Sequence, residues 1–306
     1  MKIVFFATPQ IAVRTFEALI KDDAFEIQAL VTQTDKPKGR GKKICPPPMK
    51  VVANSYNIPV FQPLKLRVDK EVIEKLKEFE PDFFVTFAYG QILSSEVLDI
   101  PKFGTINVHA SLLPKYRGAN PIAAAILNND KITGITTVLS VLELDAGDIC
   151  LQKEIKIDED ETTFSLSEKI SSLAPDLLKE TLKDLYNGTL TPKKQDETLV
   201  SFAHKFKKED FKINWGVCAD DFCCKVRSMP CHTSLRGKKI IVLGAQKGTM
   251  QGECSKILKV SKEGIEVALK SGSVIIKKVK PEGKGEMDAY SFANGARLKE
   301  GDMFDD

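Results

Sequence analysis

The chain of 306 residues is 42% apolar and 28% charged, a composition typical of a soluble globular protein long enough for one large domain and a smaller one. The apolar run at residues 1–7 is too short for a signal peptide, and no segment approaches the roughly 18 apolar residues of a membrane span. Seven cysteines without an export signal indicate free thiols in a reducing compartment. We therefore expect a cytoplasmic protein that makes no contact with a membrane.

Short apolar runs alternate with helical patterns over the first 190 residues. Residues 2–7 form a predicted strand, followed by a helix at 9–21 that begins at Pro9 with Thr8 as its cap. In chain order, the next predictions are strands at 25–32, 82–88, 104–108 and 134–142, with helices at 68–79, 119–128 and 162–187. This alternation predicts an α/β domain with a Rossmann-like, mainly parallel sheet and helices on both faces. The turn after the first strand lacks the G-x-G-x-x-G fingerprint, which argues against a nicotinamide dehydrogenase.

The pattern changes from α/β to β near residue 190. A helix near 217–227 precedes short strands at 238–245, 257–260, 265–269 and 274–279, with glycines between them. Short strands with glycine turns predict a small OB-like β-barrel, a domain type that binds oligonucleotides. The sequence thus predicts a catalytic domain at 1–189, a linker at 190–206 and a C-terminal barrel domain at 207–306.

Charge also divides the chain. Residues 207–306 hold 19 Lys and Arg against 14 Asp and Glu, a net charge of +5, whereas residues 1–206 have a net charge of −2. A basic C-terminal third favours a polyanionic partner, although a solvated lysine-rich surface has the same composition.

The strand at 104–108 runs into the most informative motif, NVHASLLP, which begins at Asn107. Asn107 and His109 alternate with Val108, so in an extended chain their side chains share one face. A second polar cluster, LDAGD at 144–148, follows the apolar run at 134–142 and adds an aspartate. An amide donor, an imidazole and a carboxylate at strand ends can polarise a carbonyl and move a proton, which is the chemistry of acyl transfer.

The segment NVHASLLPKYRGANP at 107–121, followed by LDAGD, resembles the folate-dependent formyltransferases. Within that superfamily, TQTDKPKGRGKK at 32–43, FAYGQIL at 87–93 and QDETLV at 195–200 resemble the methionyl-tRNA formyltransferase family. The resemblance covers essentially the whole chain and is dense up to about Trp215. It implies 10-formyltetrahydrofolate as co-substrate, initiator methionyl-tRNA as acceptor, and no metal, because the formyl carbon is already activated.

The resemblance also implies roles for individual residues. Asn107 donates a hydrogen bond to the carbonyl oxygen as it becomes an oxyanion, and His109 adds a second donor or shuttles the proton between the attacking amine and the leaving nitrogen. Asp145 orients and charges His109, or accepts the amine proton. Sequence leaves these proton routes open. The implied folate pocket is lined by Phe87, Tyr89, Gly90, Ile92, Leu93, Ser111, Leu112, Leu113, Pro114, Leu139 and Leu142, although an apolar core would also account for the apolar side chains among them.

The segment at 35–50 carries six Lys and Arg against one Asp, a net charge of +5. Loops of that length without secondary structure are usually functional or disordered. As a phosphate clamp, the segment would grip a nucleic-acid backbone with its cations. The resemblance favours this function and implies tRNA contacts from Lys36, Lys38, Arg40, Lys42 and Lys43.

A zinc site is a further hypothesis, because four residues separate Cys218 from Cys223 and His232 follows Cys231. The adjacent Cys223 and Cys224, however, would point to different faces of a helix. We therefore favour the interpretation of these thiols as small apolar packing residues and expect no metal.

Two other functions fit part of the pattern. A formyltransferase acting on a nucleotide-linked amino sugar, or a folate hydrolase domain, would keep Asn107, His109 and Asp145 but would not explain the basic segment at 36–43. A non-catalytic RNA-binding protein would explain the basic charge but not the three polar residues. The sequence therefore favours a monomeric enzyme that formylates the α-amino group of methionyl-tRNA for translation initiation.

Overall fold

The computed structural model describes residues 1–39, 41 and 43–305, and these fold into two compact units. The N-terminal unit contains Met1–Pro121, Ile132–Lys156 and Phe164–Ala203. The C-terminal unit contains His204–Asp306 together with two short segments from earlier in the chain, Ile122–Lys131 and Ile157–Thr163. Helix α5 (Pro121–Leu127) thus belongs almost wholly to the C-terminal unit.

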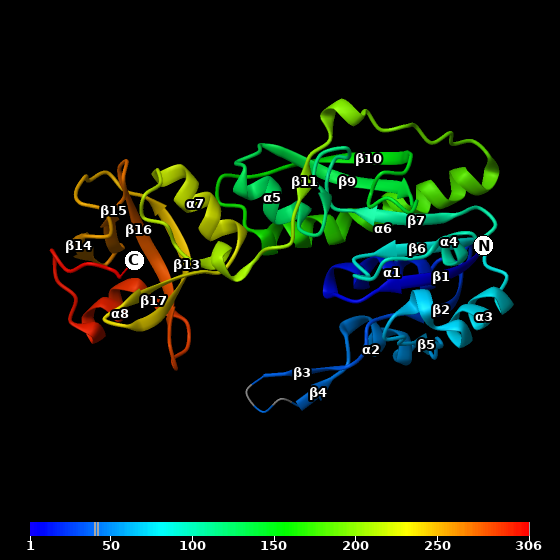
Figure 1. Ribbon diagram of the computed structural model, residues 1–306, viewed down its shortest axis with the longest axis horizontal. Coiled ribbons are helices and arrows are strands. Elements are labelled where there is room, and N and C mark those ends of the chain that lie inside the picture. The colour runs from blue at the N-terminus through cyan, green and yellow to red at the C-terminus, as the bar shows by residue number, and fades with distance from the viewer. Residues whose placement is uncertain (40, 42, 306) are drawn as a thin grey trace. The chain divides into compact units, whose positions relative to one another are not determined.

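The N-terminal unit is built on a seven-stranded sheet in the order β10-β9-β7-β6-β1-β2-β5 (Figure 1). Its strands are β1 (Lys2–Ala7), β2 (Glu26–Val31), β5 (Val60–Phe61), β6 (Phe83–Phe87), β7 (Thr105–His109), β9 (Ile132–Leu139) and β10 (Ile149–Lys156). The five strands from β7 to β5 are parallel, whereas β9 runs antiparallel to both β7 and β10. The predicted mainly parallel sheet is confirmed, and strand β10, which pairs antiparallel with β9, was not predicted.

Helices cover both faces of this sheet, as predicted. They are η1 (Gln10–Ala12), α1 (Val13–Ile20), α2 (Pro48–Ser55), η2 (Leu66–Val68), α3 (Lys70–Glu78), α4 (Ser95–Leu98), α6 (Thr163–Asn187) and η3 (Glu197–Leu199). On one face, Val4 of β1 joins Ile73 of α3 in a buried cluster. The next residue, Phe5, points to the other face and its ring meets Phe16 of α1 at 5.1 Å between centroids. No helix among the described residues is long and apolar enough to cross a membrane.

The predicted cap of the first helix is wrong. The helical segment begins as η1 at Gln10, and its N-cap is Pro9, which makes no side-chain cap. Thr8 instead donates its hydroxyl hydrogen to the carbonyl oxygen of Tyr89 at 3.1 Å and accepts from the backbone N–H of Gln33 at 3.4 Å. The hydroxyl therefore joins segments that follow three neighbouring parallel strands, β1, β2 and β6, rather than the turn of its own helix.

The basic segment at 35–50 is not structureless, which corrects the interpretation of it as a long loop. Strand β3 (Lys36–Lys38) pairs with β4 (Lys43–Cys45) in an antiparallel hairpin, and α2 follows at Pro48 (Figure 1). At the base of this basic hairpin, the Nζ of Lys50 lies 2.9 Å from Asp35 and 2.7 Å from the side-chain oxygen of Gln62. The backbone pairing of β3 with β4 thus places Lys36, Lys38 and Lys43 on a regular hairpin.

The C-terminal unit contains a second, antiparallel sheet in the order β12-β13-β16-β15-β14, and β17 also pairs with β16. Its elements are β12 (Cys231–Leu235), β13 (Lys238–Lys247), β14 (Ile257–Ser261), β15 (Gly264–Ala268), β16 (Ser273–Pro281), β17 (Met287–Asp288), η4 (Lys208–Phe211), α7 (Ala219–Ser228) and α8 (Ala289–Ala296). Asp305 bridges to Ser234 of β12, and Met303 bridges to Lys256 beside β14. Two of the last residues therefore make single bridges near the two edge strands of the sheet, β12 and β14. The predicted C-terminal β domain is confirmed as an antiparallel sheet. Among the described residues β12 does not pair directly with β14, so closure into the predicted OB-like barrel stays a prediction.

Candidate active site

Asn107 and His109 lie on β7, which is enclosed between β6 and β9. Both side chains reach the carboxylate of Asp145. The Nδ2 of Asn107 donates to Oδ1 of Asp145 at 3.1 Å, and Nδ1 of His109 lies 3.6 Å from Oδ2. The structure thus brings together the three residues predicted to be catalytic, and the His109 and Asp145 side chains are more than nine-tenths buried.

The amide of Asn107 is held in one orientation. A carboxylate accepts hydrogen bonds and does not donate, so the NH₂ group of Asn107 must face Asp145. The hydroxyl of Thr86 on β6 donates to the amide oxygen of Asn107 at 2.8 Å, which secures the other side. An amide fixed in this way presents its hydrogens in a constant direction, as an oxyanion donor must.

The tautomer of His109 follows from its neighbours. Its Nε2 lies 2.9 Å from the backbone carbonyl oxygen of Tyr116. Because a carbonyl oxygen only accepts, Nε2 is the ring atom that carries the hydrogen, and Nδ1 of the neutral ring has a free lone pair toward Asp145. A proton taken up at Nδ1 would then face Oδ2 of Asp145, 3.6 Å away.

Asp145 reaches this position through a tight return of the chain. The strand predicted to run to Leu142 ends at Leu139, which pairs with Ile106 near the start of β7 because β9 is antiparallel. The chain then turns back over β7, with Asp145 itself at φ 53°. A Cβ on Gly147 would collide with the carbonyl oxygen of Leu139, so only glycine fits where this loop closes.

A second group of side chains, for which the sequence patterns predict no role, is hydrogen-bonded to the Asp145 loop. Arg117 lies on β8 (Arg117–Gly118), which pairs with β11 (Phe202–Ala203), and it is only 1% exposed. Its guanidinium donates to Gln195 and Glu197, at 2.9 and 2.7 Å for the shorter contacts. Gln195 in turn donates to the backbone of the Asp145 loop. The motifs that contain Arg117 and Gln195 are visible in the sequence, but their contact crosses 78 positions and has no local pattern.

The residues predicted to line a folate pocket divide into a buried and an exposed set. The buried members are Phe87, Tyr89, Leu93, Ser111 and Leu113. The exposed ones are Gly90, Ile92 and Leu142, and Leu112, Pro114 and Leu139 are intermediate. Ile92 is 69% exposed and Leu142 is 65% exposed, so both offer apolar surface that a bound ring system would cover.

Within this set, several groups are held by hydrogen bonds to other elements. Gln152 on β10 donates to the carbonyl oxygen of Leu113 at 2.8 Å, and Thr136 on β9 accepts from the N–H of Leu113 at 3.1 Å. Burial raises the pKa of the Tyr89 hydroxyl, which has no hydrogen-bond partner among the described residues. The loop at 111–114 is therefore anchored by its backbone to β9 and β10.

Of the residues predicted to contact tRNA, Lys36 and Lys43 lie exposed on the two strands of the basic hairpin. The Nζ of Lys36 donates to the side-chain oxygen of Gln33 at 2.6 Å. Lys38 belongs to β3 and is paired through its backbone with Lys43. Arg40 and Lys42 lie outside the described residues.

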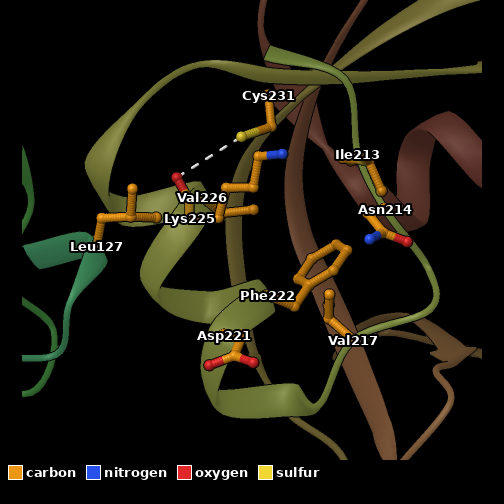
Figure 2. A pocket seen from close by; sticks show the side chains of 9 residues that line it. All are labelled: Leu127, Ile213, Asn214, Val217, Asp221, Phe222, Lys225, Val226 and Cys231. Atoms are coloured by element: carbon orange, nitrogen blue, oxygen red, sulfur yellow. Dashed lines mark hydrogen bonds between the residues drawn. The ribbon is translucent and has the colours of Figure 1, made fainter. Parts of the chain in front are cut away.

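A cavity of about 220 Å³ lies within the C-terminal unit, beside α7 (Figure 2). Figure 2 shows the thiol of Cys231 donating to the carbonyl oxygen of Lys225 across this cavity. Burial raises the pKa of Cys231 and of Cys223 to about 11, and both side chains pack in the hydrophobic core of this unit. Among the described residues, no group of three or more His, Cys, Asp or Glu side chains is placed to hold a metal ion.

Comparisons with known proteins agree along the whole chain. The family described as formyl transferase matches residues 1–182, and the family described as formyl transferase, C-terminal domain, matches residues 205–297. A methionyl-tRNA formyltransferase from Citrifermentans bemidjiense is 43% identical over 307 residues, which cover 99% of this chain and 96% of that protein.

Two solved structures have the same fold at lower identity. WlaRD, a sugar 3N-formyltransferase crystallised with dTDP and 5-N-formyl-THF, superposes with a TM-score of 0.66 at 20% identity over 93% of this chain and 99% of its own. HypX from Aquifex aeolicus in complex with tetrahydrofolic acid gives a TM-score of 0.67 at 14% identity, covering all of this chain and 51% of its own. At these identities the likeness is one of fold.

Proposed function

The chain belongs to the methionyl-tRNA formyltransferase family, and we propose that it transfers the formyl group of 10-formyltetrahydrofolate to the α-amino group of initiator methionyl-tRNA. The product is N-formylmethionyl-tRNA for translation initiation. The observation that carries this proposal is the convergence of Asn107, His109 and Asp145 on one point of β7. An oriented amide, a neutral imidazole and a carboxylate are the groups that acyl transfer to an amine requires.

Each residue of this catalytic trio has a distinct proposed role. Asn107 uses one hydrogen of Nδ2 for Asp145 and donates the other to the formyl oxygen as negative charge develops there. His109 accepts at Nδ1 the proton that the attacking amine loses, and returns it to N10 as the bond from N10 to the formyl carbon breaks. Asp145 stabilises the imidazolium in between. Of the proton routes left open by sequence, the Nε2–H tautomer favours this one.

The proposed folate site follows β6 and continues through 111–114 and 139–142. A pterin needs apolar walls with a few polar groups between them. Ile92 and Leu142 offer exposed apolar side chains that a ring system would cover, and the buried hydroxyl of Tyr89 lacks a partner among the described residues. These observations fit an aromatic ligand with polar edges, and the folate supplies the activated formyl group when bound.

We propose that tRNA is bound by the basic hairpin through Lys36, Lys38, Arg40, Lys42 and Lys43, and by the C-terminal domain at 207–306. Phosphate recognition needs exposed cations on an element that can approach the nucleic-acid backbone. Lys36 and Lys43 are exposed on paired strands, which supports this role. The catalytic domain would then be 1–189, joined through 190–206 to the tRNA-binding domain of a cytoplasmic, monomeric enzyme.

The decisive experiment measures transfer of labelled formyl from 10-formyltetrahydrofolate to three acceptors: methionyl-tRNA, free methionine and a nucleotide-linked amino sugar. We expect efficient labelling of methionyl-tRNA alone. Preferential labelling of the amino sugar would refute the tRNA assignment while preserving formyl transfer. Failure to label any acceptor by protein that binds the folate would refute the enzymatic proposal.

A further inference from the structure

We propose that Gln195 is a positioning residue that holds Asp145 in its working geometry, with Arg117 fixing the orientation of the Gln195 amide. The Nε2 of Gln195 donates two hydrogen bonds, one to the backbone carbonyl oxygen of Asp145 and one to that of Gly147, both at 2.7 Å. One side chain therefore clamps both ends of the turn that presents the Asp145 carboxylate. This inference rests on the proposed function, since it assigns a purpose to the same carboxylate.

Arg117 determines which way the Gln195 amide faces. Its Nε and Nη2 donate to Oε1 of Gln195 at 3.1 and 2.9 Å. A guanidinium has donors only, so the amide oxygen must face Arg117 and the NH₂ group must face the two carbonyl oxygens. Glu197 pairs with Arg117 at 2.7 Å and neutralises this buried cation. The amide consequently has one orientation that satisfies all of its neighbours.

The clamp opposes a local tendency of the turn to relax. Asp145 has φ 53°, in the left-handed region that residues other than glycine rarely adopt. Its carboxylate is held separately by the backbone N–H of Gly118, which donates to Oδ2 at 2.8 Å. Without the two hydrogen bonds from Nε2 of Gln195, the carbonyl oxygens of Asp145 and Gly147 lose their shared partner, and Oδ2 can shift from its place 3.6 Å from Nδ1 of His109.

Arg117 also connects the clamp to His109 through its own backbone neighbours. The residue before it, Tyr116, provides the carbonyl oxygen that receives Nε2–H of His109, and the residue after it, Gly118, donates to Asp145. His109 and Asp145 are therefore both hydrogen-bonded to the backbone of the segment 116–118. The chain continues from Gln195 to β11, and β11 pairs with β8. The segment that carries Gln195 is therefore attached to the strand that carries Arg117.

Gln195→Glu tests the clamp with little change in shape. A carboxylate keeps the contact with Arg117 but cannot donate to the carbonyl oxygens of Asp145 and Gly147, and would repel them. We expect kcat to fall by on the order of 10- to 100-fold, the scale for a misplaced catalytic group, with KM for both substrates changed by less than about threefold. Asp196→Asn is the matched control, because the neighbouring Asp196 is exposed and bonds only within its own turn, to Thr198. It should keep normal turnover.

A double-mutant cycle separates positioning from general loss of structure. If Gln195 acts through Asp145, adding Gln195→Glu to Asp145→Asn should lower kcat by less than about threefold further. An equal loss of kcat in both backgrounds, or an effect on KM alone, would overturn the inference. Unchanged turnover in Gln195→Glu alongside a large loss in Asp145→Asn would overturn it while leaving the proposed function intact. Unchanged turnover in Asp145→Asn would instead refute the role of Asp145 in the proposed function.

Discussion

The end of β7 and the basic hairpin are both polar regions of the N-terminal unit, but they are built in opposite ways. At β7, His109 and Asp145 are buried, and each side chain is held by partners from other strands and loops. On the hairpin, Lys36 and Lys43 are exposed on strands paired through their backbones, and among the described residues the Nζ of Lys36 bonds only to the nearby Gln33. Buried, fixed groups can act on one reacting atom, whereas exposed cations attract a polyanion over a distance. The first region should therefore control kcat, and the second should control KM and salt dependence.

The largest effects should come from the catalytic trio. Replacing Asn107, His109 or Asp145 by Ala should lower kcat by roughly 10² or more each, because each removes a transition-state donor or a proton-transfer group. The losses should be non-additive in pairs, since the three residues act as a unit. Steady-state formylation kinetics with a folding check by circular dichroism measure this. Near-normal turnover in His109→Ala would refute the proposed mechanism.

Neutralising the hairpin should have a smaller effect, confined to tRNA. Changing Lys36, Lys38, Arg40, Lys42 and Lys43 to Gln should raise KM for methionyl-tRNA by about tenfold or more and leave folate binding unchanged. Each lost phosphate contact should also remove about 0.7 to 0.9 from the slope of log K against log salt concentration. Arg40 should contribute most, because its planar fork grips a phosphate or stacks on a base.

A control for net charge is available on α3, where Lys75 and Lys77 are exposed and paired with glutamates of their own helix. Gln at these two positions should leave KM for tRNA and the salt slope within experimental error. If the hairpin variant and this control show the same KM for tRNA and the same salt slope, the hairpin is not a tRNA-binding element. The proposed contrast between the hairpin and the end of β7 would then be wrong.

The cysteines should differ in their reactivity toward alkylation according to their burial. Burial raises the pKa of Cys223 and Cys231 to about 11 and that of Cys150 to about 12, whereas Cys254 is exposed. Because the thiolate is the reactive form, alkylation at pH 8 should modify Cys254 more than about tenfold faster than these three. Mass spectrometry of peptides from protein labelled for increasing times measures the rates. Equal labelling of Cys231 would show that the C-terminal core is open.

The smallest expected effect concerns His232, which is partly buried in the C-terminal unit. Burial first, and then the charges of Lys239, Lys212 and Lys225, hold the pKa of His232 below its usual 6.5. The unfolded chain therefore binds the proton more readily, so stability is highest above pH 6.5 and falls as the pH drops through that value toward the lower folded pKa. His232→Gln should shrink the loss of thermal midpoint between pH 7.5 and 5.5 by about a degree or two. An unchanged pH dependence would contradict this account.

Local patterns were sufficient for most of the framework. The apolar run at 82–88 and the alternation at 104–108 correspond to β6 and β7, because a buried parallel strand needs uninterrupted apolar residues whatever lies beside it. The sequence did not predict β10, because its second half reads QKEIK, in which only Ile155 is buried, and so lacks such a run. It also missed the basic hairpin, since strands of three residues are stabilised by pairing with each other rather than by an apolar pattern.

The amino-acid sequence by itself determined that Asn107 and His109 share one face, because they are two apart on one strand and a shared face is a property of extended backbone. Only the tertiary structure decided how Asp145 reaches them. The antiparallel course of β9, the left-handed turn at Asp145, and the contacts of Arg117 with Gln195 depend on pairings between residues far apart in the chain. Such contacts leave no periodic pattern in the local sequence. They stabilise the protein only after the sheet has brought the distant segments together.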